Sequence, residues 1–159
     1  MKKTLLAAAI ACLVSPAFGE DSMIMNKADI KWGDVPPSLP KGAKIAVLYG
    51  DPGKAGQFTL RLQMPAGYKI APHWHSKDEN LTLISGEMYL GMGEKMDRAK
   101  ATALKAGGYH YLAAKTNHYA FTRDKMTVIQ VSGEGPFDIH WINPADDPMK
   151  MAKKPAGKM

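Results

Sequence analysis

Hydrophobic and polar residues alternate along much of this chain with the period of β-strands. Between Gln57 and Met64 every second residue is large and apolar, which is typical of a strand with one buried face. Turns such as Asp51–Gly53 and Ser85–Gly86 separate this run from other short apolar runs, a pattern that predicts an all-β sandwich or barrel. The runs expected as strands are Ile45–Tyr49, Gln57–Met64, Leu81–Ile84, Met88–Met92, His118–Thr122, Met126–Val131 and Phe137–Ile142.

A helical period is much weaker than the strand pattern. Only the stretch Glu94–Leu104 spaces its apolar residues in a way that predicts a helix. The proline-containing stretch before Lys44 predicts an extended arm, and its residues Asp29–Trp32 are expected to lie against the barrel because Ile30 and Trp32 are apolar. The expected organisation is a signal peptide over 1–19, an arm over 20–43, one barrel domain over 44–145 and a basic tail over 146–159.

The first nineteen residues have the pattern of a secretory signal peptide. Lys2 and Lys3 precede a short apolar run, and Ala17-Phe18-Gly19 fits a small-x-small cleavage site before Glu20. The apolar run is shorter than the roughly 20 residues that a membrane-spanning helix needs. The sequence therefore predicts a periplasmic or secreted product without stable membrane insertion.

Charge and cysteine content restrict the chemistry of the mature chain. Its one cysteine, Cys12, lies in the signal peptide, so a metal site in the mature protein cannot use thiolate ligands. The net charge of the whole chain is +6, and loss of Lys2 and Lys3 lowers it by two. The lysines of the last ten residues predict a solvated tail, and no nucleic-acid partner is expected, since aromatic residues are not interleaved with the basic ones.

One spacing of polar residues predicts a metal site. His73 and His75 flank a single residue, so on a strand their side chains point to the same face about 6.6 Å apart. Glu79 follows four residues later and can return to that face across a short turn. Two imidazoles and one carboxylate on one face form the start of a site for a first-row transition metal.

The same stretch resembles the first motif of the cupin superfamily, in which Gly, His-x-His, Glu and Gly recur at fixed spacing. Here it is Gly67, five residues, His73-Trp74-His75, three residues, Glu79, six residues and Gly86. The stretch from Gly107 to Thr122 resembles the second motif, although Ala113, Lys115 and Thr122 replace the usual Pro, Gly and Asn. This resemblance implies a double-stranded β-helix, or jelly roll, with His118 as a further metal ligand.

The resemblance also implies what the site does. The expected ligands His73, His75, Glu79 and His118 would hold one divalent ion, for which Fe or Mn is favoured while Ni, Cu and Zn remain open. We expect a metalloenzyme with oxygenase, lyase or isomerase chemistry on a small oxygenated molecule, in which Glu79 also accepts a proton. The alternative is a non-catalytic cupin that binds a metal or ligand as a sensor or scavenger. Family resemblance alone suggests a homodimer.

Several polar residues outside this set have simpler expected roles. His110 and His140 are expected to make ordinary hydrogen bonds, and Trp74 to face away from the ligands. Asp78 and Asn80 are expected in a solvated turn, with support of a ligand imidazole as the alternative. Arg61 and Gln63 are expected on the solvent face, with anion binding in the pocket as the alternative. Leu81, Leu83 and Ala120 are the expected apolar lining of the pocket.

Overall fold

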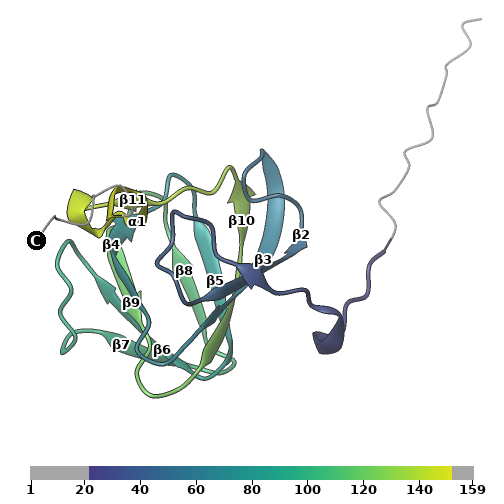
Figure 1. Ribbon diagram of the computed structural model, residues 1–159, viewed down its shortest axis with the longest axis horizontal. Coiled ribbons are helices and arrows are strands. Elements are labelled where there is room, and N and C mark those ends of the chain that lie inside the picture. Colours follow the sequence, from purple (N-terminus) through teal and green to yellow (C-terminus); the bar gives the residue numbers. More distant parts are fainter. Residues whose placement is uncertain (1–21, 152–159) are drawn as a thin grey trace, which may run out of the picture.

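The computed structural model describes residues 22–151, which fold into two antiparallel β-sheets that face each other (Figure 1). One sheet has the strand order β1-β2-β3-β10-β5-β8, and the other has the order β11-β4-β9-β6-β7. The expected all-β double-stranded β-helix is thereby confirmed. The strands are β1 (Gly33–Asp34), β2 (Lys44–Tyr49), β3 (Gly56–Met64), β4 (Lys69–Trp74), β5 (Glu79–Ser85), β6 (Glu87–Met92), β7 (Thr102–Lys105), β8 (Tyr109–Leu112), β9 (His118–Phe121), β10 (Thr127–Gly135) and β11 (His140–Trp141).

The core lies between the sheets and is built by the alternation seen in the sequence. In β3 the side chains of Phe58, Leu60, Leu62 and Met64 are buried, whereas Arg61 turns outward and donates to the Gln130 side chain. β10 pairs with β3 along its whole length and with β5 on its other side, so three long strands form the centre of one sheet. These three strands form one wall of the barrel, and β5 contributes the expected ligand Glu79 to the site.

Two predicted elements differ from the structure. The stretch Glu94–Leu104 is not helical: it is a loop that leads into β7, whose residues pair with β6. This ladder satisfies the backbone groups of Thr102–Lys105, and the Tyr119 hydroxyl holds the loop by donating to the Asp97 carbonyl (2.7 Å). In the second case, only His140–Trp141 of the expected strand Phe137–Ile142 is a strand. The residues before it, 137–139, lie outside both sheets and line the barrel interior.

The tyrosine that holds this loop also explains one glycine. Gly91 of β6 pairs with Tyr119 of β9, and a Cβ atom at Gly91 would lie 2.1 Å from Cζ of the tyrosine ring. Real Cβ atoms do not approach a ring so closely, so the buried ring occupies the space that any other side chain at this position would need. Glycine at this position is therefore a packing requirement.

The segments before β2 and after β11 lie on the barrel. Ile30 is buried as expected, and Trp32 is half-buried. The Tyr68 hydroxyl donates to the carbonyl of Pro40, which ties the preceding segment to the barrel, and burial raises the pKa of this phenol to about 12. Short helical turns η1 (Lys27–Asp29), η2 (Pro144–Asp146) and α1 (Pro148–Met151) complete the described chain.

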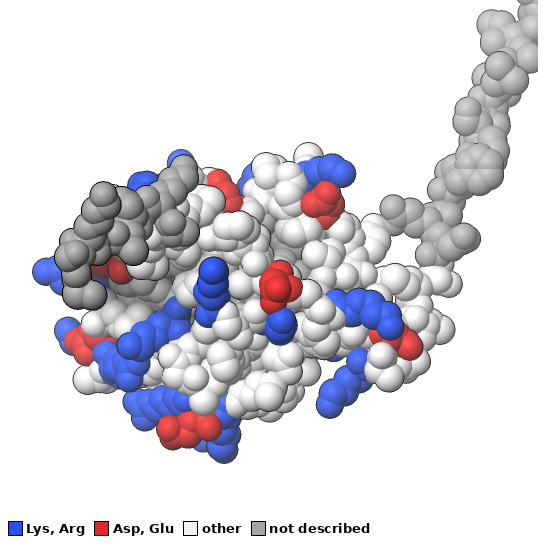
Figure 2. All heavy atoms as spheres, viewed as in Figure 1, with Lys and Arg blue, Asp and Glu red and all other residues white. Residues whose placement is uncertain are grey.

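Charged side chains of both signs lie on the face of the molecule that Figure 2 presents, with Lys and Arg interspersed with Asp and Glu. Among the described residues no helix is long and apolar enough to cross a membrane. The expected signal peptide and most of the expected basic tail lie outside the described residues.

The turn before His118 contains a strained residue. Lys115 has a φ of 63°, in the left-handed region, and it occupies the position where the cupin resemblance expects glycine. Its N–H donates to the carbonyl of His75 (2.8 Å), so the strained turn links two of the expected ligands.

We expect Lys115→Gly to raise the free energy of unfolding by about 0.5–1 kcal/mol, because glycine adopts this φ without a steric clash of its Cβ. Urea denaturation of the variant and the parent protein measures the difference. Lys125→Gly is the matched control, since Lys125 is exposed and has an ordinary φ, and it should be neutral or destabilising. Equal destabilisation by both substitutions would contradict the assignment of strain to Lys115.

Candidate metal centre

The four expected ligands come from both sheets: three lie on or directly after the paired strands β4 and β9, and one lies on β5 of the other sheet. His73 lies near the end of β4 and His75 directly follows that strand, while Glu79 begins β5 and His118 begins β9. β4 pairs with β9 so that His73 is opposite His118. All four side chains are buried, with 3% of His73, 6% of His75, 7% of Glu79 and 3% of His118 exposed.

The three imidazoles form a compact cluster. His73, His75 and His118 each place a possible ligand nitrogen so that these atoms all lie within 4.8 Å of one another. Glu79 adjoins two of them: its Oε2 lies 3.3 Å from Nε2 of His75 and 3.7 Å from Nε2 of His118. Imidazole nitrogens bind a divalent transition-metal ion at about 2.0–2.1 Å, so one ion between the three ligand nitrogens could reach all three histidines.

Backbone carbonyl groups orient every imidazole of the cluster. Nδ1 of His73 donates to the carbonyl of Ala71 (2.7 Å), and Nδ1 of His118 donates to the carbonyl of Thr116 (3.0 Å). Nδ1 of His75 donates to the carbonyl of Asp138 (2.5 Å). Because a carbonyl only accepts, each Nδ1 carries a proton and each Nε2 is left to face the cluster, as in histidines that bind metals.

Burial sets the protonation of two of the histidines. It lowers the pKa of His73 well below the ordinary value, and the neighbouring His118 and His75 lower it further. Burial also lowers the pKa of His118, although the charge of Glu79 partly opposes this effect. Both imidazoles are therefore neutral at neutral pH, the form in which Nε2 can bind a metal ion.

His75 and Glu79 form a coupled pair. Burial lowers the pKa of His75, but its hydrogen bond with Glu79, the charge of that carboxylate and the nearby Asp138 together outweigh burial and raise the pKa overall. Burial raises the pKa of Glu79, but the hydrogen bond from His75 and the charges of His75 and His118 outweigh it and lower the pKa. Glu79 is thus ionised at neutral pH, and a divalent cation could replace the proton that His75 holds.

Asp138 fixes the position of His75 from the loop before β11. Its backbone carbonyl accepts from His75, and its carboxylate accepts from the Ser76 N–H (2.8 Å), the Ser76 hydroxyl (2.6 Å) and His140 Nε2 (2.8 Å). Partial burial opposes ionisation of Asp138, but these hydrogen bonds lower its pKa to about 2. The Phe137 ring stacks on His75 with centroids 4.3 Å apart, so this loop restrains the imidazole on two sides.

The cluster lies in the wall of a cavity of about 390 Å³. Expected lining residues Leu81 and Ala120 do line it, whereas Leu83 is fully buried and does not. Pro36, Leu39 and Met149 also line it, so the segments before β2 and after β11 contribute to its wall. The cavity lies at the small end of the roughly 300–1,000 Å³ range of ligand sites, which suits a compact molecule. Its further aliphatic lining consists of Ile45, Leu60, Leu62, Ile70, Met88, Leu90, Ile129, Val131 and Ile139.

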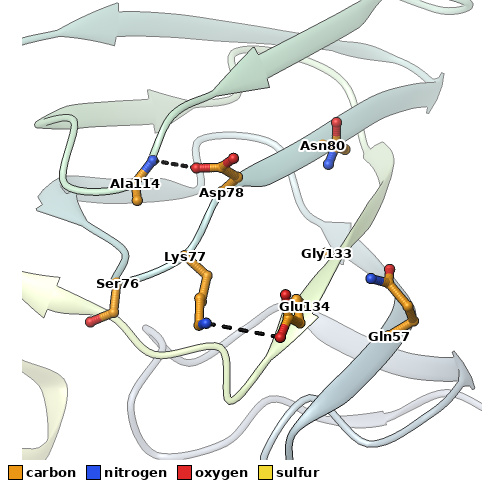
Figure 3. Close-up of a pocket in the computed structure, with 8 residues that line it drawn as sticks. All are labelled: Gln57, Ser76, Lys77, Asp78, Asn80, Ala114, Gly133 and Glu134. Atoms are coloured by element: carbon orange, nitrogen blue, oxygen red, sulfur yellow. Dashed lines mark hydrogen bonds and ion pairs between the residues drawn. The ribbon is translucent and has the colours of Figure 1, made fainter.

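Most of the other polar candidates lie outside the cavity. His140 makes an ordinary hydrogen bond to Asp138. Trp74 faces away from the ligands, and its ring stacks on the His140 ring with centroids 3.9 Å apart. Figure 3 shows Asp78 and Asn80 at an outer pocket, where Asp78 accepts from the Ala114 N–H (2.8 Å). Tyr111 and Tyr109 bond to these two side chains, so neither supports a ligand imidazole. Arg61 and Gln63 bond to Gln130 and Met126 and do not line the cavity.

Two residues of the site were missed or misread in the sequence. Asp138 was not a candidate, because it reaches His75 through a backbone carbonyl that any residue type carries. The side chain of His110 was expected to make an ordinary hydrogen bond, but within residues 22–151 its imidazole makes none, and the residue lines the cavity. Only the pairing of its strand with β5 reveals this placement.

A family model described as a domain of unknown function (DUF4437) matches residues 17–140, a span that includes every residue of the cluster. The chain belongs to this family. DUF4437 is a cupin-like family, and the cupin resemblance of the sequence is confirmed. No curated protein sequence matches the chain.

Solved structures with the same fold have low sequence identity to this DUF4437 protein. The polyketide cyclase RemF from Streptomyces resistomycificus is similar with a TM-score of 0.68 and 15% identity, over 85% of this chain and 95% of that one. A protein provisionally described as an acetylacetone dioxygenase from Methylibium petroleiphilum PM1 has a TM-score of 0.60 and 22% identity, over 82% and 88%. An RmlC-like cupin from Shewanella frigidimarina NCIMB 400 has a TM-score of 0.55 and 12% identity, over 73% and 94%. At these identities the likeness shows the fold alone.

Proposed function

We propose that this protein is an exported mononuclear metalloenzyme that acts on a small oxygen-bearing organic molecule. The observation that carries the proposal is the convergence of three buried imidazoles on the wall of an apolar cavity of about 390 Å³. Carbonyl groups fix each imidazole with Nε2 toward the cluster, which orients these nitrogens for a shared ion.

The proposed ligands are His73, His75, His118 and Glu79, with Fe or Mn as the favoured ion. A bound divalent ion would supply Lewis acidity and, for iron or manganese, redox chemistry. The apolar wall would exclude water and hold the body of the substrate. Glu79 is ionised and buried beside the histidine cluster, so its carboxylate could accept a proton from a C–H or O–H group of a bound substrate.

The structural neighbours include a described polyketide cyclase and a described dioxygenase, so the proposed enzymatic role is one for which this fold is used. Their low identities leave the reaction open between oxygenase, lyase and isomerase chemistry. Acetylacetone and small keto and hydroxy acids are the first substrates to screen, because each presents oxygen atoms for the ion and a compact apolar body.

The full chain, expressed with its signal peptide and purified without added metal, tests the proposal. We expect about one equivalent of Fe or Mn by mass spectrometry, and turnover of a screened substrate, followed by oxygen uptake or product analysis, that Glu79→Gln abolishes. The export proposal requires an intact mass beginning at Glu20 and recovery in the periplasmic fraction. Stoichiometric metal without turnover of any substrate would favour the non-catalytic binding role, and absence of metal would contradict both roles.

A further inference from the structure

His110 lies on the inner face of the barrel beside the candidate metal centre. β8 pairs with β5 so that His110 is opposite Leu81, and the next residue pair along the ladder on this face joins Leu112 to Glu79. Residues opposite each other in an antiparallel pair share a face of the sheet, and Leu81 is buried in the core. His110 therefore points inward, one diagonal step from Glu79, while Tyr109 and Tyr111 point outward to Asn80 and Asp78.

Among the described residues, His110 is the one histidine whose side chain makes no hydrogen bond. The chain has five histidines, and the other four all bond to carbonyl groups or to side chains. The imidazole of His110 is half-buried and lines the central cavity, yet no described residue bonds to it. His110 is close enough to Glu79 and His118 to influence the pKa of each, but its imidazole has no hydrogen-bond partner among the described residues and is available to a molecule inside the cavity.

The rest of the cavity wall offers few polar groups. Apart from the four proposed ligands and His110, the polar side chains that line it belong to Ser38 and Asp138. The Asp138 carboxylate is already bonded to Ser76 and His140. His110 and Leu90 line both the central cavity and a second cleft of about 520 Å³. His110 therefore lies between the cavity and this cleft.

We propose that His110 is a further ligand-binding residue, which hydrogen-bonds an oxygen substituent of a small molecule bound at the metal centre. This inference rests on the proposed function and specifies its substrate class. The substrate would be a compact, mostly apolar molecule with two oxygen functions, one directed to the ion and the second, a carboxylate, carbonyl or hydroxyl, directed to His110. The aliphatic wall would surround the carbon skeleton between these two groups.

Matched carboxylic acids test this inference on the Co²⁺-loaded full-length mature protein. Acetate has one oxygen function, while malonate and succinate each carry a second one at different distances from the first. The visible absorption of Co²⁺ reports binding of each acid at the ion. We expect the parent protein to bind at least one diacid more tightly than acetate, and His110→Phe to weaken that diacid about tenfold without changing acetate. His110→Gln, which retains hydrogen-bonding groups, should recover most of the affinity.

Tyr111→Phe is the matched control, because Tyr111 is the outward-facing neighbour on the same strand. It should leave all affinities unchanged, and melting temperatures of all variants verify that they are folded. Unchanged diacid binding in His110→Phe, or equal weakening of diacids and acetate, would overturn the inference while leaving the metal centre intact. Failure of the parent protein to bind Co²⁺ would overturn the proposed function and this inference with it.

Discussion

His118→Ala is expected to lower the metal content from about one equivalent to below about a tenth, because the substitution removes one of three converging imidazoles. His118 is the best single position for this test: it is buried, its tautomer is fixed by Thr116, and its neutral form dominates at neutral pH. Metal bound only to the folded state stabilises it, by about 2.7 kcal/mol at a concentration one hundred times the dissociation constant. The variant should therefore lose the rise in melting temperature that added Fe²⁺ or Mn²⁺ gives the parent protein.

His140→Ala is the matched control for this experiment. His140 is another histidine near the site and lies on the edge strand β11. Its side chain is 42% exposed and bonds Asp138 and Ser76 outside the cluster. With metal in excess this variant should retain about one equivalent. Full metal content in His118→Ala would contradict the assignment of His118 as a ligand. Loss of metal in His140→Ala would mean that His140, and not His118, completes the ligand set.

The sequence predicted the fold because strand alternation is a local signal. The alternation between Gln57 and Met64 became β3 with the expected buried face, and the cupin resemblance supplied the jelly-roll architecture. The four-residue strands β7 and β8 were missed, since most of their side chains are not buried, whereas the equally short β9 has four buried residues and was predicted. The false helix at Glu94–Leu104 has a tertiary cause, because pairing with β6 and the bond from Tyr119 determine its path.

The candidate site could be predicted only where its residues are adjacent in the sequence or belong to a known motif. The spacing of His73, His75 and Glu79 is local, and His118 was found by resemblance; the structure brings all four together. His110 could not be found in this way, because the register of β8 against β5 decides which face it occupies. The ligand set, the identity of the ion, the domain boundaries and the export of the protein stay predictions.

Because His75 and Glu79 form a coupled pair, we expect the stability of the metal-free protein and its affinity for a metal ion to change in opposite directions as the pH rises. In the metal-free protein the pKa of His75 is raised above its ordinary 6.5. The stability that this shift provides is fully present below the unfolded pKa and is lost as the pH rises through the folded value. The pKa values of His73 and His118 are lowered, so neither gains or loses a proton above about pH 6.5. The metal-free protein should therefore become less stable as the pH rises above about 6.5.

Metal affinity should change in the other direction over the same range. The ion must displace the proton of His75, so affinity should rise with pH until His75 is deprotonated, and one proton should be released per ion bound below that point. Titrations with Mn²⁺ in two buffers of different ionisation enthalpy, at several pH values, measure the affinity and the protons released. Thermal unfolding with and without the ion, in the same buffers, measures both stability trends.

Glu79→Gln separates the role of the carboxylate in this coupling from its role as a ligand. Without the negative charge of Glu79, only Asp138 opposes the effect of burial on His75, so the pKa of His75 should fall relative to the parent protein. Above about pH 6.5 the pH trend of the metal-free protein and the proton release should therefore both decrease sharply. If Glu79 also binds the ion, affinity should fall at least about tenfold even at high pH, where His75 is neutral in both proteins. Loss of the pH trend with unchanged affinity at high pH would show that three histidines hold the ion and that Glu79 serves as a base beside it. A pH trend that persists in the variant would mean that the proton resides elsewhere, and the pairing of His75 with Glu79 would then be wrong.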